Sequence, residues 1–566
     1  MSLRRKFNSI ASDSVLRSWI FGFILGKWQK KLLTTARPPY LNNFDVNADN
    51  SEADIYIKSL KYELPEKPFY QKFAGTPLNI DLKQSINIEE LTDTESQMAF
   101  HRFSWMLEPL TIIEPAWVVV LWKFWLSEFG KKKDSLAWHP YTVSERLINL
   151  LRFFLKNGFP NPGKETRNAL CEHGIHIFDN LEYYGEEDTG NHLLNNGRAL
   201  YLAGILLKLD SWIKVGLEII IRERGRIFNE NNELKEGSVH YHLLISSWYL
   251  ECWLAARDNS RPEEKQLLEI VRGNLYGGSL FDLPGGLPLI GDVSPDCSPN
   301  YLNCLITGKV GGWLAKLRSD QRQEVLELIA TSKLDPETRR RQKPGEWWRK
   351  DLGQWSVIGP KAKDGWQPYP GHGHQDFGGF ELHFGRTKIF VDIGRRSYDI
   401  DGDIDKAATS HNVLTVDEKP AYPENRAYYS REFKNTIVGS APNWNISDRK
   451  VSFSTGAFER INGVGSWTRK WSFFEEGVQI LDAVDGSGYH QIDRYLYTIL
   501  KPEFVDGHII CGPIKIVGAK NPTFSQAKYW SSYAEGEDAY VIKISGKEKL
   551  PFTGKLYFHY KSSGKD

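Results

Sequence analysis

The sequence predicts a multidomain α+β protein in which repeated helix pairs precede an antiparallel β-sandwich. Two observations predict this order: apolar residues recur at spacings of three and four up to about residue 335, and later they alternate every second position. A chain of 566 residues is too long for one hydrophobic core, so at least two large domains are expected. We expect a partly helical N-terminal extension (1–94), the helical domain (95–335), a linker (336–352) and the sandwich (353–566).

The first 31 residues combine basic side chains with a short apolar run from Trp19 to Leu25. That run is too short to span a bilayer, and Lys27 and Lys30 follow it closely. Because no small-residue cleavage site follows either, we interpret the segment as a surface-seeking amphipathic helix and not as a signal peptide or transmembrane segment. A cytoplasmic protein is therefore expected.

Five segments of the helical domain show a clear helical period. They are residues 144–156, 191–209, 210–228, 241–257 and 321–330. Turn-forming runs such as NGFPNPG and NENNELKEG separate them. Repeated helix pairs of this kind favour a helical toroid or solenoid over a compact bundle.

The second half has the pattern of a β domain. The charged run LDPETRRRQKPGEWWRKD holds two prolines and is interpreted as the linker. Short alternating segments bounded by Gly, Asp or Pro then predict strands at 354–359, 378–385, 387–394, 412–417, 451–456, 467–475 and 477–486. Strands without intervening helices indicate antiparallel sheets packed as a sandwich.

Composition excludes several classes of partner. The net charge is +1, so no global field attracts nucleic acid or an anionic membrane, and any polyanion site must be a local cleft. The five cysteines are scattered and odd in number, which argues against a disulfide framework and fits a reducing compartment. Aromatic residues make up 13% and are open to two interpretations: large cores, or faces that stack on sugar rings.

Three polar clusters are candidates for chemistry. Asn191 and His192 stand in GNHLLNNG at a predicted helix start, where Asn191 either faces a ligand or only caps the helix. Tyr241 and His242 stand in EGSVHYHLL at the start of another helix.

The third cluster is GHGHQD, with His372 and His374 two residues apart, so that on an extended strand they would share a face. Asp392 and His411 follow where neighbouring strands are expected. Two imidazoles and a carboxylate form a plausible divalent-metal set, with zinc the natural ion. The alternative is a satisfied polar network inside the sandwich.

These motifs, in this order, resemble the heparinase II/III-like polysaccharide lyases. The resemblance rests on GNHLL, the S-x-x-Y-H form of Ser238–His242, GHGHxD followed by FEL and VDxG, and HNVLTVD. It covers roughly residues 95–420, and AWHPYTVSERLINLL resembles members associated with bacterial capsule or O-antigen synthesis. It implies a bacterial protein with an (α/α) toroid, a C-terminal β-sandwich and a cleft between them that cleaves an acidic, uronate-containing polysaccharide by β-elimination.

The resemblance also implies roles for four residues. Asn191 would hold the uronate carboxylate, and His192 beside it would act as a stabiliser or base. Tyr241 would be the central acid/base, with a pKa lowered by neighbouring cations. His372, delivered from the sandwich, would be the second acid/base.

A metal site and further substrate contacts follow by the same likeness. His374, Asp392 and His411 match the family's metal-binding trio, whose ion would organise the loop that carries His372. Arg146 and Arg198 are candidates to pair with substrate carboxylates or sulfates, with a surface or interdomain salt bridge as the alternative for each. His242 and Tyr428 are further candidates for substrate contact.

Some residues depart from the family pattern, and the function stays open between three classes. Asn195 stands where many relatives have Glu, no Arg precedes His411 in KAATSHN, and Gly291–Ser298 keeps an acidic turn seen in relatives. The first function is a lyase. The second is a uronosyl C5-epimerase, which removes the same proton and returns it to the opposite face. The third is a glycan-binding protein without catalysis.

Overall fold

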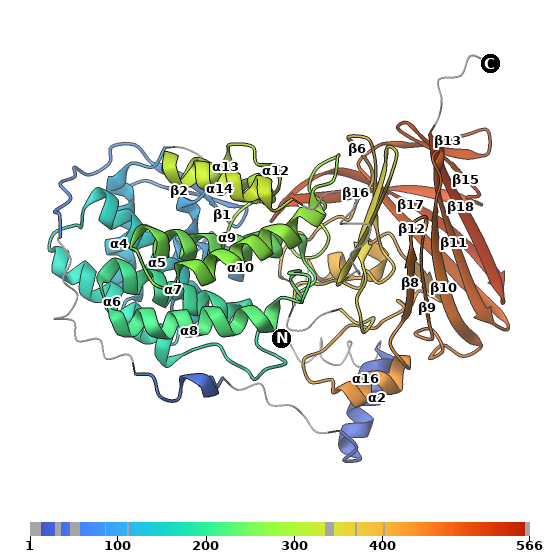
Figure 1. The fold of residues 1–566 in the computed structure, drawn as a ribbon, viewed down its shortest axis with the longest axis horizontal. Helices are drawn as coiled ribbons and strands as arrows, with labels where there is room; N and C mark the ends of the chain where they lie inside the picture. Colours follow the sequence, from blue (N-terminus) through green and yellow to red (C-terminus); the bar gives the residue numbers. More distant parts are fainter. Residues whose placement is uncertain are drawn as a thin grey trace.

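The computed structural model describes residues 13–28, 35–45, 57–84, 86–109, 112–333, 345–367, 371–399 and 402–560. They form two bodies side by side, with helices on the left of Figure 1 and sheets on the right. Among the described residues, no helix is long and apolar enough to cross a bilayer. All five cysteines are buried and unpaired.

The first body is the predicted helical toroid. Its helices are α3 (Thr94–Arg102), α4 (Pro115–Phe129), α5 (Pro140–Asn157), α6 (Gly163–Asp179), α7 (Asn191–Leu207), α8 (Asp210–Ile227), α9 (Val239–Asp258), α10 (Glu264–Gly278), α11 (Pro299–Leu302), α12 (Cys304–Thr307), α13 (Gly312–Ala315) and α14 (Ser319–Thr331). Helix α7 packs against α5, α6, α8 and α9, so it lies centrally among the helices. Each of the five predicted helical segments is confirmed within a few residues.

Close packing of α7 on α8 depends on a glycine. A Cβ atom at Gly216 would lie 2.4 Å from the backbone nitrogen of Tyr201 and 2.6 Å from the carbonyl oxygen of Gly197. Any larger residue would therefore push the two helices apart. The core behind them holds fully buried Trp122, Trp125, Trp212 and Trp253.

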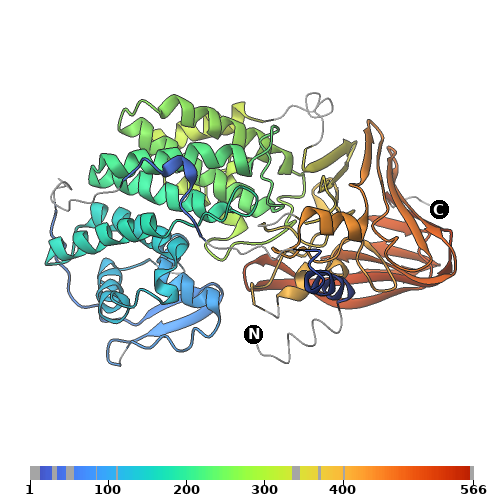
Figure 2. The ribbon, with the colours of Figure 1, turned by 90° about the horizontal axis from the view of Figure 1, so that it is seen from below.

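The N-terminal extension contains more than the predicted helix. Helix α2 (Ser14–Ile24) confirms that prediction, but a hairpin of β1 (Phe69–Phe73) and β2 (Thr76–Ile80) also forms. Phe69 and Phe73 lie against Trp105, with ring centroids 5.1 and 6.2 Å apart, so the hairpin shares the core of the helical body. Figure 2 shows the blue hairpin strands beside the helices.

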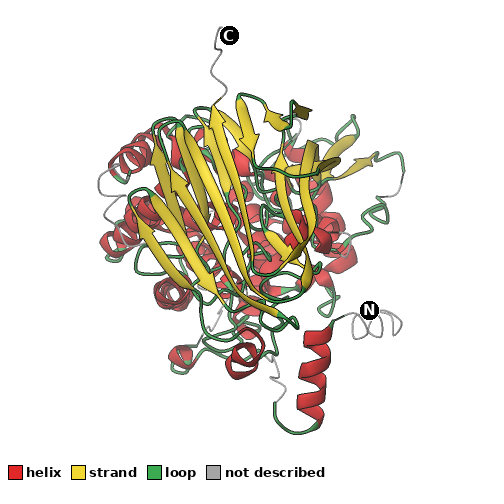
Figure 3. Ribbon diagram, turned by 90° about the vertical axis from the view of Figure 1, so that its right-hand side faces the viewer, coloured by secondary structure: helices red, strands yellow, loops and turns green. Residues whose placement is uncertain are grey.

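The second body is built from three antiparallel sheets. In spatial order they are β13-β14-β15-β18-β11-β10-β9-β8, β16-β17-β12-β7 and β3-β4-β5-β6. The strands are β3 (Trp347–Leu352), β4 (Trp355–Pro360), β5 (Glu381–Phe384), β6 (Thr387–Phe390), β7 (Leu414–Val416), β8 (Asn443–Ser447), β9 (Lys450–Thr455), β10 (Val464–Phe473), β11 (Gly477–Gly486), β12 (Tyr489–Thr498), β13 (Pro502–Val505), β14 (His508–Cys511), β15 (Ile514–Val517), β16 (Pro522–Ser532), β17 (Glu535–Lys549) and β18 (Phe552–Tyr560). Figure 3 shows the broad sheet in yellow. One helix, α16 (Arg431–Val438), was not expected here.

The predicted linker is wrong at its C-terminal end. Strand β3 occupies Trp347–Leu352 and pairs with β4, with Trp348 opposite Gly359. The charged residues in this strand interrupt the alternation from which strands were predicted. One of them, Arg349, donates to the carbonyls of Leu280 and Asp282 in the toroid, at 2.9 and 2.8 Å. A basic residue here joins the two bodies instead of facing solvent. Residues 334–344 lie outside the described part of the chain.

Candidate active site at the domain boundary

Three segments far apart in the sequence meet where toroid and sandwich touch. Asn191 is the first residue of α7, Tyr241 lies in the first turn of α9, and His372 comes from the sandwich body. Two backbone hydrogen bonds fix the junction: the His372 amide donates to the Glu236 carbonyl at 2.6 Å, and the Asp292 amide donates to the His372 carbonyl at 2.9 Å. The candidate site is therefore built from both domains.

Residues 371–376 form no strand, which corrects the geometry expected for His372 and His374. Their side chains do not share a strand face. The His372 ring reaches Asn191 and Tyr241, while His374 is buried near His411. The glycines that alternate with them in GHGH favour a loop over a strand.

The first turn of α9 is fixed by Ser238. Its hydroxyl oxygen accepts from the Tyr241 amide at 3.1 Å, and the same hydroxyl donates to the Asp292 carbonyl at 2.7 Å. His240 accepts from the Ser294 amide at 2.9 Å. These bonds attach the acidic turn at 291–298 to the first turn of α9, which carries Tyr241.

Tyr241 lies between two aromatic partners. Its ring stacks on His372, with centroids 3.5 Å apart and planes 11° apart. Its hydroxyl lies 2.7 Å from the hydroxyl of Tyr398, which also donates to the Val293 carbonyl at 3.2 Å. Burial raises the pKa of Tyr241 well above its ordinary value, and the bond to Tyr398 offsets only part of this. The expected lowering by cations is wrong, because the phenol is buried with no cation contacting its hydroxyl among the described residues.

Asp292 joins the rings of the sandwich to the toroid. Its Oδ2 lies 3.0 Å from His372 Nδ1, its Oδ1 lies 2.8 Å from His374 Nε2, and Arg395 Nη1 donates to both oxygens at 3.0 and 3.2 Å. Burial opposes the charge, but the hydrogen bonds from both imidazoles and the Arg395 cation hold the pKa of Asp292 well below its usual range. An ionised Asp292 keeps the proton of His372 on Nδ1 and leaves Nε2 with its lone pair.

Asn191 lies at the Nε2 side of His372. Its side-chain nitrogen donates to His372 Nε2 and to Glu236 Oε2, both at 3.0 Å. The opposite atoms, Asn191 Oδ1 and Glu236 Oε1, are buried without a partner among the described residues. The side chain makes no capping hydrogen bond to α7. The capping alternative is therefore wrong, and the amide faces the meeting point of the domains.

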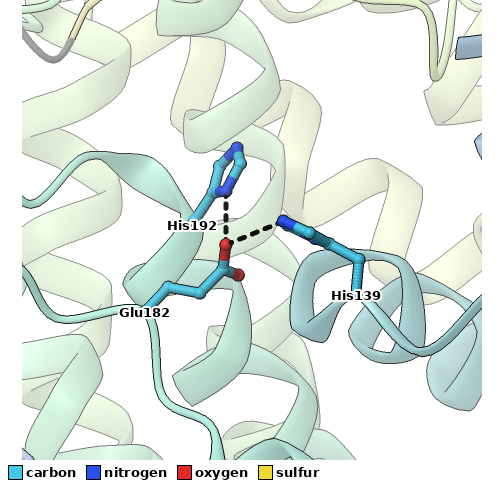
Figure 4. A group of neighbouring side chains, drawn as sticks. All are labelled: His139, Glu182 and His192. Atoms are coloured by element: carbon cyan, nitrogen blue, oxygen red, sulfur yellow. Dashed lines mark hydrogen bonds and ion pairs between the residues drawn. The ribbon is translucent and has the colours of Figure 1, made fainter. Parts of the chain in front are cut away.

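His192 belongs to a group with Glu182 and His139, shown in Figure 4. Glu182 Oε1 lies 2.8 Å from His192 Nδ1 and 3.5 Å from His139 Nε2. Burial alone would lower the pKa of His192, but the Glu182 carboxylate outweighs it and raises this pKa. Burial lowers the pKa of His139. Glu182 therefore fixes the His192 ring and increases the share of His192 that is cationic.

The second group of possible metal ligands is His374, Asp392 and His411, all buried. His411 Nδ1 lies 2.7 Å from Asp392 Oδ2, and the rings of His374 and His411 lie 5.1 Å apart. His374 Nδ1 and His411 Nε2 are buried without a hydrogen-bond partner among the described residues. Two unpartnered ring nitrogens beside a carboxylate fit a divalent ion, and Asp292 on the far nitrogen of His374 is the outer partner that metal-bound histidines use.

The same test gives a different result for His139, Glu182 and His192. Their candidate ligand atoms also lie within 4.8 Å of one another. There, however, His139 Nδ1 is buried without a partner among the described residues, so a metal on Nε2 would leave an unsatisfied N–H group. This group fits a hydrogen-bond network better than a metal site.

Three predicted substrate contacts are placed inside the toroid. Arg146 is fully buried, bonds to His173 Nε2 at 2.8 Å and lies over the Trp125 ring at 3.9 Å. Arg198 pairs with Glu145 at 2.7 Å and with a second carboxylate at 2.6 Å.

His242 is also buried, with Nε2 3.0 Å from the Asn274 carbonyl and Nδ1 accepting from the Leu234 amide at 3.3 Å. Arg146 therefore forms no salt bridge among the described residues, and Arg198 forms its ion pairs inside the toroid rather than at the surface or between the domains. None of the three side chains is available to a ligand.

Tyr428 lies on a cleft of about 900 Å³ between toroid loops and the sandwich body. Glu236, which bonds to Asn191, lines the same cleft, so it extends from the candidate site. Both charge signs line it, including Arg226, Arg426 and Glu346. This placement is compatible with the predicted contact of Tyr428 with a substrate.

Several residues of the site had no assigned role in the sequence. Asp292 stood in a recognised acidic turn, but only the fold shows that it meets His372. Glu182 and Tyr398 sit in runs without any motif, and Arg395 follows VDIG by one residue. For Arg395 the only available signal was a basic residue directly after the predicted strand 387–394, and this did not indicate which residue it would bind.

A toroid joined to a sandwich, with Asn191, Tyr241 and His372 meeting at the boundary, places this chain in the class of two-domain toroid-sandwich proteins. Family models confirm this: the heparinase II/III N-terminus matches residues 25–265, and the heparinase II/III-like C-terminal domain matches 345–510. The chain belongs to the heparinase II/III-like family.

Individual relatives are distant. A heparin-sulfate lyase of Bacteroides thetaiotaomicron is 24% identical over 251 residues, which cover 40% of this chain and 35% of that protein. The chain thus matches about a third of that relative's length. A heparinase III structure has a TM-score of 0.59 at 17% identity, covering 85% of this chain and 78% of its own. A mutant heparan sulfate lyase from Pedobacter heparinus has a TM-score of 0.51 at 14% identity, covering 99% and 92%. These structures establish the fold.

Proposed function

We propose that the protein is a polysaccharide lyase that cleaves a uronate-containing glycan, of the glycosaminoglycan kind, by β-elimination. The observation that carries the proposal is the junction of Asn191, Tyr241 and His372, three chemically distinct groups from three segments, in which Asn191 and Tyr241 each contact His372. The names of the relatives, a heparin-sulfate lyase among them, support the reaction class.

The electrostatics of the site support a division of roles. His372 carries its proton on Nδ1 toward Asp292, so the Nε2 lone pair, which accepts from Asn191 in the free protein, can take the C5 proton once Asn191 donates to the uronate carboxylate. Tyr241 keeps its proton, because burial raises its pKa, and it can donate to the departing O4. In this step the C5–H and C4–O4 bonds break, a C4=C5 double bond forms and O4 becomes a hydroxyl. A proton then passes from His372 Nε2 to the Tyr241 oxygen, which restores both groups to their starting protonation.

Charge on the uronate carboxylate must be stabilised as the C5 proton leaves, because that electron pair spreads into the carboxylate. Asn191 Nδ2 donates to His372 and Glu236 in the free protein, and a carboxylate would replace one of them as acceptor. Glu182 raises the pKa of His192 and so favours a cationic ring near this carboxylate. The role of His192 is therefore stabiliser rather than base.

A divalent metal is proposed at His374, Asp392 and His411, with zinc the ion best suited to two imidazoles and one carboxylate. When bound, it would supply fixed positive charge and a rigid ligand geometry. This chain's residues do the rest: His374 holds Asp292 Oδ1, and Asp292 Oδ2 holds His372. The ion would thus fix the position of His372 through His374 and Asp292, and it would not contact the substrate.

The test is the replacement of Tyr241 by phenylalanine, assayed on heparan-, chondroitin- and alginate-type polymers. We expect turnover to fall at least about a thousandfold, because the acid is removed, while circular dichroism and the melting temperature stay near wild type. Val310→Phe, at an exposed toroid position, is the control. A folded Tyr241→Phe variant with wild-type turnover would remove Tyr241 from the mechanism.

A further inference from the structure

Helix α2 is attached to the sandwich body through one face only. Val15, Leu16 and Trp19 are buried, and the Trp19 ring lies 4.5 Å from the ring of Tyr428. Beyond the helix, Trp28 meets Phe433 of α16 at 5.5 Å. Figure 1 shows α2 in blue beside α16 in orange, and in Figure 3 the helix nearest the N-terminus projects below the body. This contact fixes the direction in which α2 points.

The far end of α2 exposes a group of large apolar side chains. Phe21 is 66% exposed, Phe23 41%, Ile24 72% and Leu25 55%. Four such residues within five positions form a continuous apolar tip, whereas apolar residues scattered singly over a surface are ordinary. Leaving this tip in water is unfavourable, so a second apolar phase would cover it.

The sequence around this tip is strongly basic. Residues 1–31 contain seven Lys and Arg and one acidic residue, Asp13, although the whole chain carries a net charge of only +1. Lys27 directly follows the tip and is exposed. An apolar group flanked by a basic segment matches the two signals that hold a protein on an anionic lipid surface.

We propose that α2 docks this protein onto an anionic lipid surface, with the tip inserted among the acyl chains and the exposed Lys27 at the headgroups. Helix α2 has 11 residues, too few to span a bilayer, so the attachment is peripheral. Because Trp19 packs on Tyr428 and Tyr428 lines the cleft, docking places the mouth of that cleft beside the lipid.

Sedimentation of the full chain with vesicles tests this. We expect the protein to pellet with phosphatidylglycerol vesicles and to stay in solution with phosphatidylcholine vesicles. High salt should weaken the pelleting, because the headgroup attraction is screened. A double variant, Phe21→Glu with Ile24→Glu, should lower the partition coefficient by about tenfold or more. Both positions are exposed, so the fold is retained.

Val310→Glu is the matched control, because Val310 is a 60% exposed apolar residue on the toroid. It should pellet like wild type. The proposal is overturned if wild type ignores phosphatidylglycerol vesicles, if the double variant pellets as well as wild type, or if Val310→Glu loses binding equally. A self-associated species in light scattering without vesicle binding would also overturn it, by showing that a second copy covers the tip.

Discussion

Replacing Asp292 with asparagine removes the negative charge that pairs this toroid residue with His372, His374 and Arg395 of the sandwich body. In the wild type this carboxylate accepts from His372, His374 and Arg395, and it is almost fully buried. Removing one partner of a buried ion pair costs about 3–5 kcal/mol. Arg395 keeps Asp403 at 3.3 Å, so we expect the lower end, about 3 kcal/mol.

Catalysis should suffer more than stability. Asparagine cannot hold the proton of His372 on Nδ1 as a carboxylate does, so the lone pair on Nε2 is no longer assured. An asparagine at the corresponding position of a His–Asp pair reduces turnover by up to about 10⁴-fold in serine proteases, and we expect at least about a hundredfold here. Turnover and denaturant unfolding, measured on the same preparations, give the two effects.

The pH dependence gives a further check. The folded pKa of Asp292 is depressed, so its ionisation stabilises the fold above the unfolded value of about 3.9 and this stabilisation disappears as pH falls through the folded value. The stability difference between wild type and Asp292→Asn should be constant above about pH 5 and narrow in more acid solution.

Asp403→Asn is the control, because Asp403 touches the same Arg395 but its side chain is 66% exposed. It should cost less than about 1 kcal/mol and leave turnover unchanged. Equal losses in the two variants, or wild-type turnover in Asp292→Asn, would refute the role given to Asp292.

Three further predictions concern groups around this point. Tyr398→Phe removes the bond that lowers the pKa of Tyr241, so activity should persist to higher pH; Tyr533→Phe, which loses only a bond to the Tyr398 amide at 2.9 Å, should keep the wild-type profile. Glu182→Gln should lower the pKa of His192, so kcat/KM should fall at neutral pH and recover as the solution is acidified. His139→Gln is the control, because His139 Nε2 lies 3.5 Å from Glu182 Oε1, and it should shift the pH profile less. Superimposable profiles of wild type and Glu182→Gln would contradict this role of Glu182. His411→Asn should lose bound zinc in elemental analysis together with activity, while His490→Asn, paired with Asp417 elsewhere in the sandwich body, should keep both; a metal-free wild type would contradict the site.

Periodicity predicted the architecture well because each domain repeats one pattern. The helices α5, α7, α8, α9 and α14 fall where apolar residues recur every three or four positions. Strand β3 was missed because Arg349, Lys350 and Asp351 break the alternation. Arg349 bonds across to the toroid, a contact that no local pattern contains.

The site was predictable in its motif residues and less so in its partners. Asn191, Tyr241 and His372 lie in distinctive runs, and they do meet. The roles predicted for Arg146 and Arg198 were wrong because the sequence does not show whether a guanidinium binds a substrate or a partner buried inside the protein.

The electrostatic partners follow from chain topology. Asp292 lies 80 residues from His372 in sequence, and Tyr398 lies 157 residues from Tyr241. Burial then decides the pKa of Tyr241, and burial is a property of the assembled domains.

The most direct test of β-elimination is NMR of uronate polysaccharides incubated with the protein in D2O. We expect olefinic signals of a 4,5-unsaturated uronate on at least one polymer, and none with Tyr241→Phe. Deuterium at C5 of an unbroken chain would contradict cleavage and establish an epimerase that uses the same base. An absence of both signals on every polymer, with wild type and Tyr241→Phe behaving alike, would contradict catalysis and favour a glycan-binding protein.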